Sequence, residues 1–307
     1  LGDVYKRQVL LNDIHEVAHA NYVCDELGLD TISAGVVVSW ALECVEKGIL
    51  TEKDFGKEIR FSDLDSVVHL LELIANREKL GDLLAQGVKM ASEQTGQGTE
   101  NFAIQVKGLE WSGYECRNAP GMMLAYMTSD IGAHHARAWV LGHDLAGTAA
   151  NVHDLISSGG EAKALPKSSV KDKAGNVVAS QHLRPLFDLL GVCRLQYMEL
   201  GFEVEHYEDL FAAVTGKKMS WEEMLAVSER VWHLTRMISV REVEGYGRHM
   251  DYPPARFMND PIPDGPNKGH CISKPEVEEL LDDYYAARGW DENGIPTLDK
   301  LKDVGLA

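Results

Sequence analysis

A six-residue pattern occurs twice in this chain, at residues 25–30 and again at residues 188–193. Each copy reads Asp-x-x-Gly, followed by an aliphatic residue and then by Asp or Cys. Because glycine commonly ends a helix in the left-handed conformation, one copy alone is typical of an ordinary helix C-terminus. Two copies with the same acidic residue favour another interpretation, in which two helix ends hold two similar halves of one ligand. The ordinary helix end remains the alternative for each copy.

The first four positions of the pattern indicate which chemical groups the ligand would present to the protein. Asp25 and Asp188 would lie on the last turn of their helices, beside backbone that Gly28 and Gly191 leave open to close approach. A carboxylate at that place can accept two parallel N–H bonds from a flat, guanidine-like edge, as it does from arginine. A pterin ring presents such an edge.

The last two positions of the pattern complete the predicted site. Leu29 and Val192 are the aliphatic residues that follow the glycines. The final residues differ in chemistry, because Asp30 offers a hard oxygen ligand, whereas Cys193 offers a soft thiolate suited to an iron–sulfur cluster. Cys193 is therefore a candidate cluster ligand.

These motifs resemble those of the aldehyde ferredoxin oxidoreductase family, the tungsten or molybdenum bis-pterin enzymes of anaerobes. That family carries two Asp-x-x-Gly-Leu-(Asp/Cys) motifs, one for each pterin, and the second ends in the fourth cysteine of a 4Fe–4S cluster. The resemblance therefore implies that the two motifs bind the cofactor through Asp25, Gly28, Leu29, Asp30, Asp188, Gly191 and Val192, and that Cys193 is a ligand of the cluster. Val192 in place of the second leucine is a departure that keeps the apolar character. Further similarity lies within residues 21–33, 108–139, 241–257 and 284–297, so the resemblance extends over nearly all of residues 9–307.

The resemblance implies a mostly α fold with two helical domains, which are domains 2 and 3 of that family, without its N-terminal β-rich domain. We expect the first helical pterin-binding domain over residues 9–105, incomplete at its start, and the second, with the cluster cysteine, over residues 106–307. Residues 1–8 begin without Met and resemble a translated adapter remnant, so they are set aside. The family's Cys-x-x-Cys-x-x-x-Cys motif is missing, which predicts a fragment that is inactive alone.

The hydrophobic periodicity of the residues themselves is mainly helical. Capping boxes at Ser220–Glu223 and Ser273–Glu276 predict two helix starts, the second with Pro275 in its first turn. Other expected elements are helices over residues 13–28, 35–47 and 80–91, a helix capped by Ser62, a short strand over residues 102–106 and a surface loop over residues 159–180.

His135 is the predicted catalytic residue. It lies in the run 132–138, where the resemblance implies a histidine that accepts or donates a proton beside the metal. An unperturbed pKa near 6.5 suits a histidine to that task at neutral pH. His134, in place of the family's small polar residue, is a departure, and a His-His pair taken alone is more often a satisfied or exposed pair. Arg117 matches a family arginine and is predicted to bind a pterin phosphate through its planar fork, with a surface arginine as the alternative.

Other candidate ligands carry weaker predictions. Glu16 and His19 form a Glu-x-x-His pattern that places two ligands on one helical face, as di-iron helices do. Some family members bind a bridging iron in this way, although the offset from the first motif argues against it here. Cys24 and Cys44 lie in apolar helical stretches and are predicted to be core residues. The five cysteines lack a framework spacing, which predicts reduced thiols and a cytoplasmic protein.

The composition speaks against two classes of partner. A net charge of −18 disfavours binding to nucleic acid and to anionic membrane surfaces. No apolar run approaches the roughly 20 residues that a membrane-spanning helix requires.

The resemblance implies an oxidoreductase that oxidises an aldehyde to a carboxylic acid, with ferredoxin as the electron acceptor. Tungsten or molybdenum would be held by the dithiolene sulfurs of two pterins, His135 would manage protons, and electrons would leave through the 4Fe–4S cluster at Cys193. Mg²⁺ between the pterin phosphates and a homodimer are further expectations. Two alternatives remain open: the family branch that reduces an aromatic coenzyme A thioester, and a helical binding or scaffold domain without cofactor.

Overall fold

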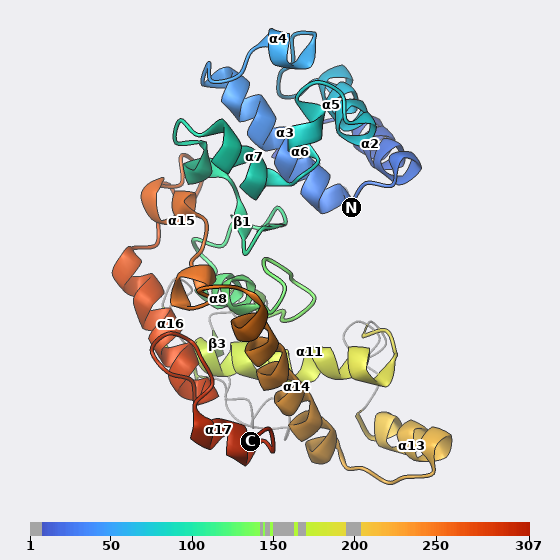
Figure 1. The fold of residues 1–307 in the computed structure, drawn as a ribbon, viewed down its shortest axis with the longest axis vertical. Helices are drawn as coiled ribbons and strands as arrows, with labels where there is room; N and C mark the ends of the chain where they lie inside the picture. Colours follow the sequence, from blue (N-terminus) through green and yellow to red (C-terminus); the bar gives the residue numbers. More distant parts are fainter. Residues whose placement is uncertain (1–7, 142–143, 145–147, 150–162, 165–169, 195–203) are drawn as a thin grey trace. The chain divides into compact units, whose positions relative to one another are not determined.

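The computed structural model describes residues 8–141, 144, 148–149, 163–164, 170–194 and 204–307 (Figure 1). The chain divides into two compact units. Unit 1 comprises Leu1–Arg117, Ile131–His134 and Tyr252–Ser273, and unit 2 comprises Asn118–Asp130, His135–Asp251 and Lys274–Ala307. The predicted mostly α fold in two helical parts is confirmed. The domain limits at 9–105 and 106–307 remain predictions, because these units are defined by contacts and do not follow chain order.

Unit 1 is built around one apolar core. The helix α3 is apolar on nearly every side and supplies the buried Trp40, while Phe55 closes the core from a short neighbouring helix. The helix α2 packs against both α3 and α5. The elements of unit 1 are α2 Ile14–Leu27, α3 Thr31–Glu46, α4 Glu52–Phe55, α5 Leu64–Asn76, α6 Gly81–Leu84, α7 Val88–Thr95, η1 Thr99–Phe102, the antiparallel pair β1 Gln105–Val106 and β2 Leu109–Glu110, and α15 Ala255–Asn259.

Two predicted helix starts in unit 1 were wrong, and both errors concern the capping residue. The helix α3 begins four residues before the expected position 35, because the Asp30 carboxylate accepts the Ser33 N–H at 2.8 Å and caps it. The cap of α5 is Asp63 rather than Ser62. Ser62 instead has a φ of 59°, and its hydroxyl donates to the carbonyl of Leu10 at 3.0 Å.

Two further expectations for unit 1 need correction. The helix expected over residues 80–91 is two helices, α6 and α7, because Gly87 adopts a φ of 88° between them. Such a positive φ interrupts an α-helix, and it is a conformation that glycine adopts readily. The strand expected over residues 102–106 is confined to Gln105–Val106, since Phe102 ends the 3₁₀ helix η1.

Unit 2 is organised around the buried helix α8, each residue of which is buried. The helix α11 packs against α8, α14 and α16, and Figure 1 shows α14 crossing it. The elements of unit 2 are α8 Pro120–Thr128, the antiparallel pair β3 Thr148–Ala149 and β4 Lys163–Ala164, α11 Ala174–Leu190, α13 Val204–Thr215, α14 Trp221–Glu242, η2 Arg248–Asp251, α16 Lys274–Arg288 and α17 Leu298–Asp303.

The predicted starts of two helices in unit 2 are confirmed. Ser220 and Glu223 form the expected capping box at the start of α14, and α16 begins at Lys274, immediately before Pro275. The surface loop expected over residues 159–180 was wrong at its end, because α11 already begins at Ala174. Most of the rest of that stretch lies outside the described residues. Within the described part of the chain, no single helix is long and apolar enough to cross a membrane.

Two buried ion pairs lie in unit 2. The Arg236 guanidinium donates to both oxygens of Asp251, at 2.6 and 3.1 Å, and Tyr285 donates its hydroxyl to the same carboxylate at 2.7 Å. The second pair joins Lys173 and Asp144 at 2.7 Å, and both side chains are at most 2% exposed. Breaking a buried pair leaves an uncompensated charge, so each pair is a point at which unit 2 is sensitive to substitution.

A buried histidine makes the stability of unit 2 depend on pH. The Arg288 guanidinium lies 2.5 Å from the His182 ring, and burial together with this positive charge lowers the pKa of His182 to about 3. The unfolded chain titrates near 6.5 and therefore binds more protons than the folded chain between pH 6.5 and 3. Consequently the free energy of unfolding should fall on acidification through that window, by up to about 1.4 kcal/mol per pH unit from this group.

The substitution His182→Gln should remove the contribution of His182 to this slope. Glutamine keeps an oxygen that can accept a hydrogen bond from Arg288 but does not titrate. Urea unfolding followed by circular dichroism at pH 7, 6, 5 and 4 measures the effect. Parallel stability profiles for the original chain and the variant would show that His182 is not the group responsible.

Candidate functional site

The two six-residue motifs form the same helix end. Gly28 has φ 68° and ψ 32°, and Gly191 has φ 69° and ψ 28°. In each case the glycine N–H bonds to the carbonyl of the motif aspartate, at 3.3 Å from Asp25 and 3.1 Å from Asp188. The following N–H bonds back to the residue before that aspartate, at 2.9 and 3.0 Å, which completes a Schellman motif. The predicted helix ends are confirmed, and their ligand remains a prediction.

The glycines are required by backbone conformation and leave the surrounding space open. A Cβ added at Gly28 or Gly191 would meet nothing within 4 Å, so crowding does not exclude a side chain at either position. Both positive φ values favour glycine, and the open space beside them permits a flat ligand to approach the backbone closely.

The first motif borders a cavity of about 280 Å³ in unit 1. Asp25 is exposed on the last turn of α2, and its carboxylate accepts the side-chain N–H of Asn21 at 3.1 Å. Leu29 is half-buried, and Asp30 caps α3 in addition to facing the cavity. The lining residues of this cavity are Leu29, Asp30, Ser33, Ala34, Val37, Ile74, Leu84, Ala85, Gln86, Gly87, Gly108 and Glu110.

Glu110 is a buried acid in this cavity wall that sequence reasoning missed. One oxygen accepts the Ser33 hydroxyl at 2.8 Å, and the other accepts the Val88 N–H at the start of α7, also at 2.8 Å. Glu110 therefore connects α3 to α7 through these two hydrogen bonds. In the sequence Glu110 is an isolated acidic residue outside the predicted elements, and nothing in the residue pattern indicates this bridging contact.

The second motif lies at the C-terminal end of α11 in unit 2. The Asp188 side chain is 68% exposed, and its carboxylate accepts an N–H from Arg137 at 2.5 Å. Val192 is exposed and borders an apolar groove of about 270 Å³ between the end of α11 and α13. Cys193 follows as an exposed, free thiol. The second helix end thus presents a carboxylate, an apolar side chain and a thiol in succession.

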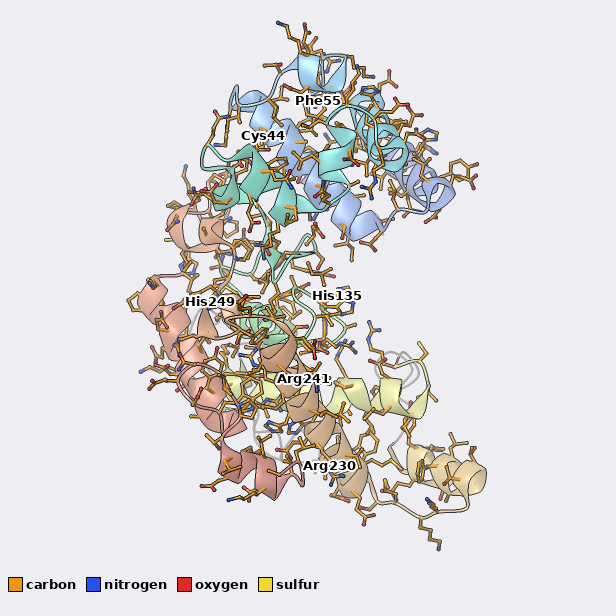
Figure 2. All side chains as sticks on the ribbon, viewed as in Figure 1. Cys44, Phe55, His135, Arg230, Arg241 and His249 are labelled. Atoms are coloured by element: carbon orange, nitrogen blue, oxygen red, sulfur yellow. The ribbon has the colours of Figure 1, made fainter. Side chains whose placement is uncertain are left out.

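One face of α11 holds the loop that carries His135. Ser180 and Arg184 are four residues apart, which places them on the same side of the helix. The Ser180 hydroxyl oxygen accepts the Trp139 N–H at 2.9 Å, and Arg184 donates to the carbonyls of His135 and Ala136 at 3.4 Å. The imidazole of His135, labelled in Figure 2, packs edge-on against Trp139 with ring centroids 6.0 Å apart.

Arg137 extends this contact to the second motif. Asp188 is four residues beyond Arg184, on the same face of α11, and Arg137 reaches it from the loop. The Nε of Arg137 also donates to Asp130 at 3.1 Å. Arg137 therefore links the loop that carries His135 to Asp188, and both residues lie in the same region of unit 2. Arg137 was missed as a site residue, although it lies two positions after His135 in the motif that carries the resemblance.

Arg117 is occupied by contacts within unit 1. It is 8% exposed, so the alternative of a surface arginine was wrong. Its guanidinium donates to both oxygens of Glu115, at 2.8 and 2.5 Å, and to the carbonyl of Asp260, and it lies over the Phe257 ring. Binding of a pterin phosphate by Arg117 remains a prediction.

The predicted meeting of Asp25 and Asp188 concerns two residues in different units, and it remains a prediction. The Glu16–His19 iron site also remains a prediction. Among the described residues, no group of three or more His, Cys, Asp or Glu side chains is arranged to hold a metal ion. Cys24 and Cys44 are buried, as predicted, and burial raises the pKa of the Cys44 thiol to about 12.

The two motif carboxylates are hydrogen-bond acceptors that fit a pterin cofactor. A pterin carries a guanidine-like N–H edge, and Asp188 already accepts a guanidinium N–H from Arg137. Asp25 likewise accepts an amide N–H while remaining exposed. A metal held by dithiolene sulfurs of such a cofactor needs no cluster of protein ligands.

Comparisons with known proteins identify the family. The family model described as "Aldehyde ferredoxin oxidoreductase, domains 2 & 3" matches residues 5–306, which begins inside the stretch 1–8 that the sequence analysis set aside. The tungsten-containing aldehyde ferredoxin oxidoreductase of Pyrococcus furiosus is 32% identical over 301 residues, covering 97% of this chain and 46% of that protein. The enzyme of the same name from Thermococcus kodakarensis is also 32% identical, over 302 residues.

Two more distant comparisons agree with this result. An aliphatic sulfonate oxidoreductase subunit of Pyrococcus furiosus, described as WOR-like, is 27% identical over 299 residues, covering 95% of this chain and 42% of that protein. The active-site complex of a benzoyl coenzyme A reductase superposes with a TM-score of 0.74 over 100% of this chain and 48% of that chain. At 24% identity the latter likeness shows the fold alone.

The chain spans about half the length of the relatives that it matches. The resemblance expected from the two motifs is confirmed by a family match over nearly the whole chain. This chain therefore belongs to the aldehyde ferredoxin oxidoreductase family and carries its domains 2 and 3.

Proposed function

We propose that this chain is the pterin-binding part of an oxidoreductase that converts an aldehyde to a carboxylic acid and passes electrons to ferredoxin. The observation that carries the proposal is the pair of matching helix ends, each with an exposed aspartate one turn before its glycine. The second of these ends is followed by an exposed free thiol. The names of the relatives support the metal, the substrate class and the electron acceptor.

When bound, a tungsten or molybdenum bis-pterin would supply the redox-active metal and its sulfur ligands, with Mg²⁺ between the pterin phosphates. Asp25 and Asp188 would each accept N–H bonds from one pterin edge. Gly28 and Gly191 would let the rings approach the backbone, because no side chain intervenes there. Leu29 and Val192 would contact the apolar faces of the rings beside these glycines.

The remaining candidate residues would handle the proton and the electrons. Conversion of an aldehyde and water to a carboxylic acid releases two electrons and two protons, and His135 would take up one of these protons on an imidazole nitrogen. Cys193 would supply one of the four ligands of a 4Fe–4S cluster that receives the electrons before ferredoxin. Arg117 would bind a pterin phosphate if its contacts with Glu115 open.

Cofactor analysis of the full-length parent protein tests this function. Asp25→Asn and Asp188→Asn should each weaken retention of one pterin by roughly 10- to 100-fold, because a charged hydrogen-bond acceptor is lost. Cys193→Ser should leave the pterin content unchanged and reduce the 4Fe–4S signal in electron paramagnetic resonance. Pterin and tungsten contents, measured after purification without oxygen, give the readout.

The exposed Asp264→Asn variant provides a matched control, since it lies outside both motifs. Normal pterin content in both motif variants would contradict the pterin assignment. Viologen reduction with a panel of aldehydes, compared with reduction of aromatic coenzyme A thioesters, separates the proposed activity from the alternative family branch. The likeness to the benzoyl coenzyme A reductase does not favour that branch, because it shows only the fold.

A further inference from the structure

Arg137 is held between two carboxylates of different exposure. Its Nε donates to Asp130 at 3.1 Å, and its Nη1 donates to Asp188 at 2.5 Å. The Asp130 side chain is 15% exposed, whereas that of Asp188 is 68% exposed. Asp130 therefore provides a sheltered anchor for the guanidinium, and Asp188 is the outer partner toward which it is directed.

The contact with Arg137 leaves the Asp188 carboxylate able to accept another donor. Only its Oδ2 is bonded to Arg137, and no second hydrogen bond or ion pair to this side chain occurs within the described residues. An ionised carboxylate has two oxygens with about four acceptor sites. A second planar N–H donor can therefore bind the remaining oxygen while Arg137 keeps the carboxylate oriented.

Arg137 also belongs to the loop that carries His135. The backbone of this loop is fixed on α11 by Arg184, which donates to the His135 carbonyl, and by Ser180, which accepts the Trp139 N–H. The Asp188 carboxylate is therefore linked through one side chain, Arg137, to the loop that carries His135.

We propose that Arg137 is a positioning residue that orients Asp188 for a guanidine-like donor and couples binding at Asp188 to the ordering of the His135 loop. This inference rests on the proposed function, since it takes Asp188 to be a pterin-binding residue. Arg137 lies outside both motifs. Its contact with Asp188 links the second motif to the loop of His135, the predicted proton-transfer residue.

A purely stabilising role for Arg137 makes a different prediction. Partly exposed ion pairs contribute little to stability, so removing this one should change the melting temperature only slightly. An orienting role instead lowers ligand affinity, because the Asp188 side chain must then be immobilised when the ligand binds. Stability and affinity measured on the same variants separate the two roles.

Pterin itself, 2-amino-4-oxopteridine, is a suitable fluorescent probe for titration of the 307-residue chain, with Asp25→Asn present in the original chain and in every variant so that binding reports on Asp188. Arg137→Gln should weaken its binding by roughly 3- to 10-fold. Arg137→Lys should weaken it by a similar factor, because an ammonium keeps the charge but cannot span both carboxylates as the planar fork does. Arg241→Gln is the matched control, since Arg241 is an exposed arginine of the same unit that pairs only with its neighbour Glu242 within the described residues.

Hydrogen exchange measured by mass spectrometry reports on the coupling without any assay of activity. Addition of pterin should slow amide exchange in residues 135–139 of the original chain. The same addition should have no effect on these amides in Arg137→Gln.

The outcomes distinguish this inference from the proposed function. If the original chain does not bind pterin, or if Asp188→Asn binds it equally well, the assignment of Asp188 as a pterin ligand is wrong. If Asp188→Asn loses binding while Arg137→Gln or Arg137→Lys binds as the original chain does, only the role of Arg137 is wrong. Tighter binding by Arg137→Gln would show that the arginine competes with the ligand, and this also overturns the inference.

Discussion

Replacing Asp251 with alanine should lower the free energy of unfolding of unit 2 by about 3–5 kcal/mol, the cost typical of breaking a buried ion pair. Asp251 is fully buried and accepts hydrogen bonds from Arg236 and from the Tyr285 hydroxyl. Its removal leaves the Arg236 guanidinium buried without a counter-charge. The substitution also leaves a buried tyrosine hydroxyl without its acceptor.

The position of this pair explains why the effect should extend through unit 2. Arg236 lies on α14, Asp251 ends η2, and Tyr285 lies on α16, so one carboxylate joins three elements. Burial raises the pKa of Tyr285, and the adjacent negative charge of Asp251 adds to that effect. The neutral phenol is therefore maintained as a donor throughout the ordinary pH range.

Urea unfolding at pH 7, followed by circular dichroism, measures the loss. Asp303→Ala is the control, because Asp303 is an exposed aspartate of the same unit. The free energy of unfolding of Asp251→Asn should lie between those of Asp251→Ala and the control, since the amide keeps an oxygen acceptor but loses the charge. A loss below about 1 kcal/mol for Asp251→Ala, which is the range of exposed ion pairs, would contradict the assignment of this network as a structural centre.

The second large effect is expected at the start of the buried helix α8. Asp144 accepts the N–H groups of Gly121 and Met122, at 3.3 and 2.8 Å, and pairs with Lys173. Asp144→Leu removes the helix cap and also leaves a buried ammonium unpaired, so it should cost about 3–5 kcal/mol. Lys173→Met should cost less, because the carboxylate keeps two N–H donors and the positive end of the helix dipole.

The prediction is tested most directly by which of the two variants, Asp144→Leu or Lys173→Met, loses more free energy of unfolding. Both variants introduce an apolar side chain of comparable length, so the difference between them reports on the capping contacts. Denaturant unfolding of both variants under the same conditions gives the comparison. An equal loss of stability in Asp144→Leu and Lys173→Met, or a larger loss in Lys173→Met, would show that the capping contacts of Asp144 contribute nothing to the stability of unit 2.

The helix ends of the two motifs were predictable because their requirement is local. A glycine after an apolar helical run, with its positive φ, is specified by residues within one turn. The cap at Asp30 was missed because the same carboxylate had been interpreted as a ligand. The choice between Ser62 and Asp63 is ambiguous in sequence, since both residues are good caps and lie next to each other.

The contacts that organise the candidate site were not predictable in the same way. Arg137 and Asp188 are brought together by the packing of a loop on α11, and their spacing in sequence has no helical or strand period. Arg236 lies in a helix with many charged residues, where an arginine is typical of a solvated face, and only the fold shows that it is buried. Such pairings depend on tertiary packing, which single-sequence patterns do not encode.

Unit 1 is assembled from three separate segments of the chain, and this affects how it folds during synthesis on the ribosome. Arg256 donates to Glu43 at 2.9 Å, and Phe257 packs on Trp111 with ring centroids 5.0 Å apart. These contacts join residues that precede unit 2 in the chain to residues 252–273, which are synthesised only after most of unit 2. Because domains tend to fold as they are synthesised, the helices α2 to α7 must wait for this later segment to complete unit 1. During that interval their incomplete surface is available to chaperones.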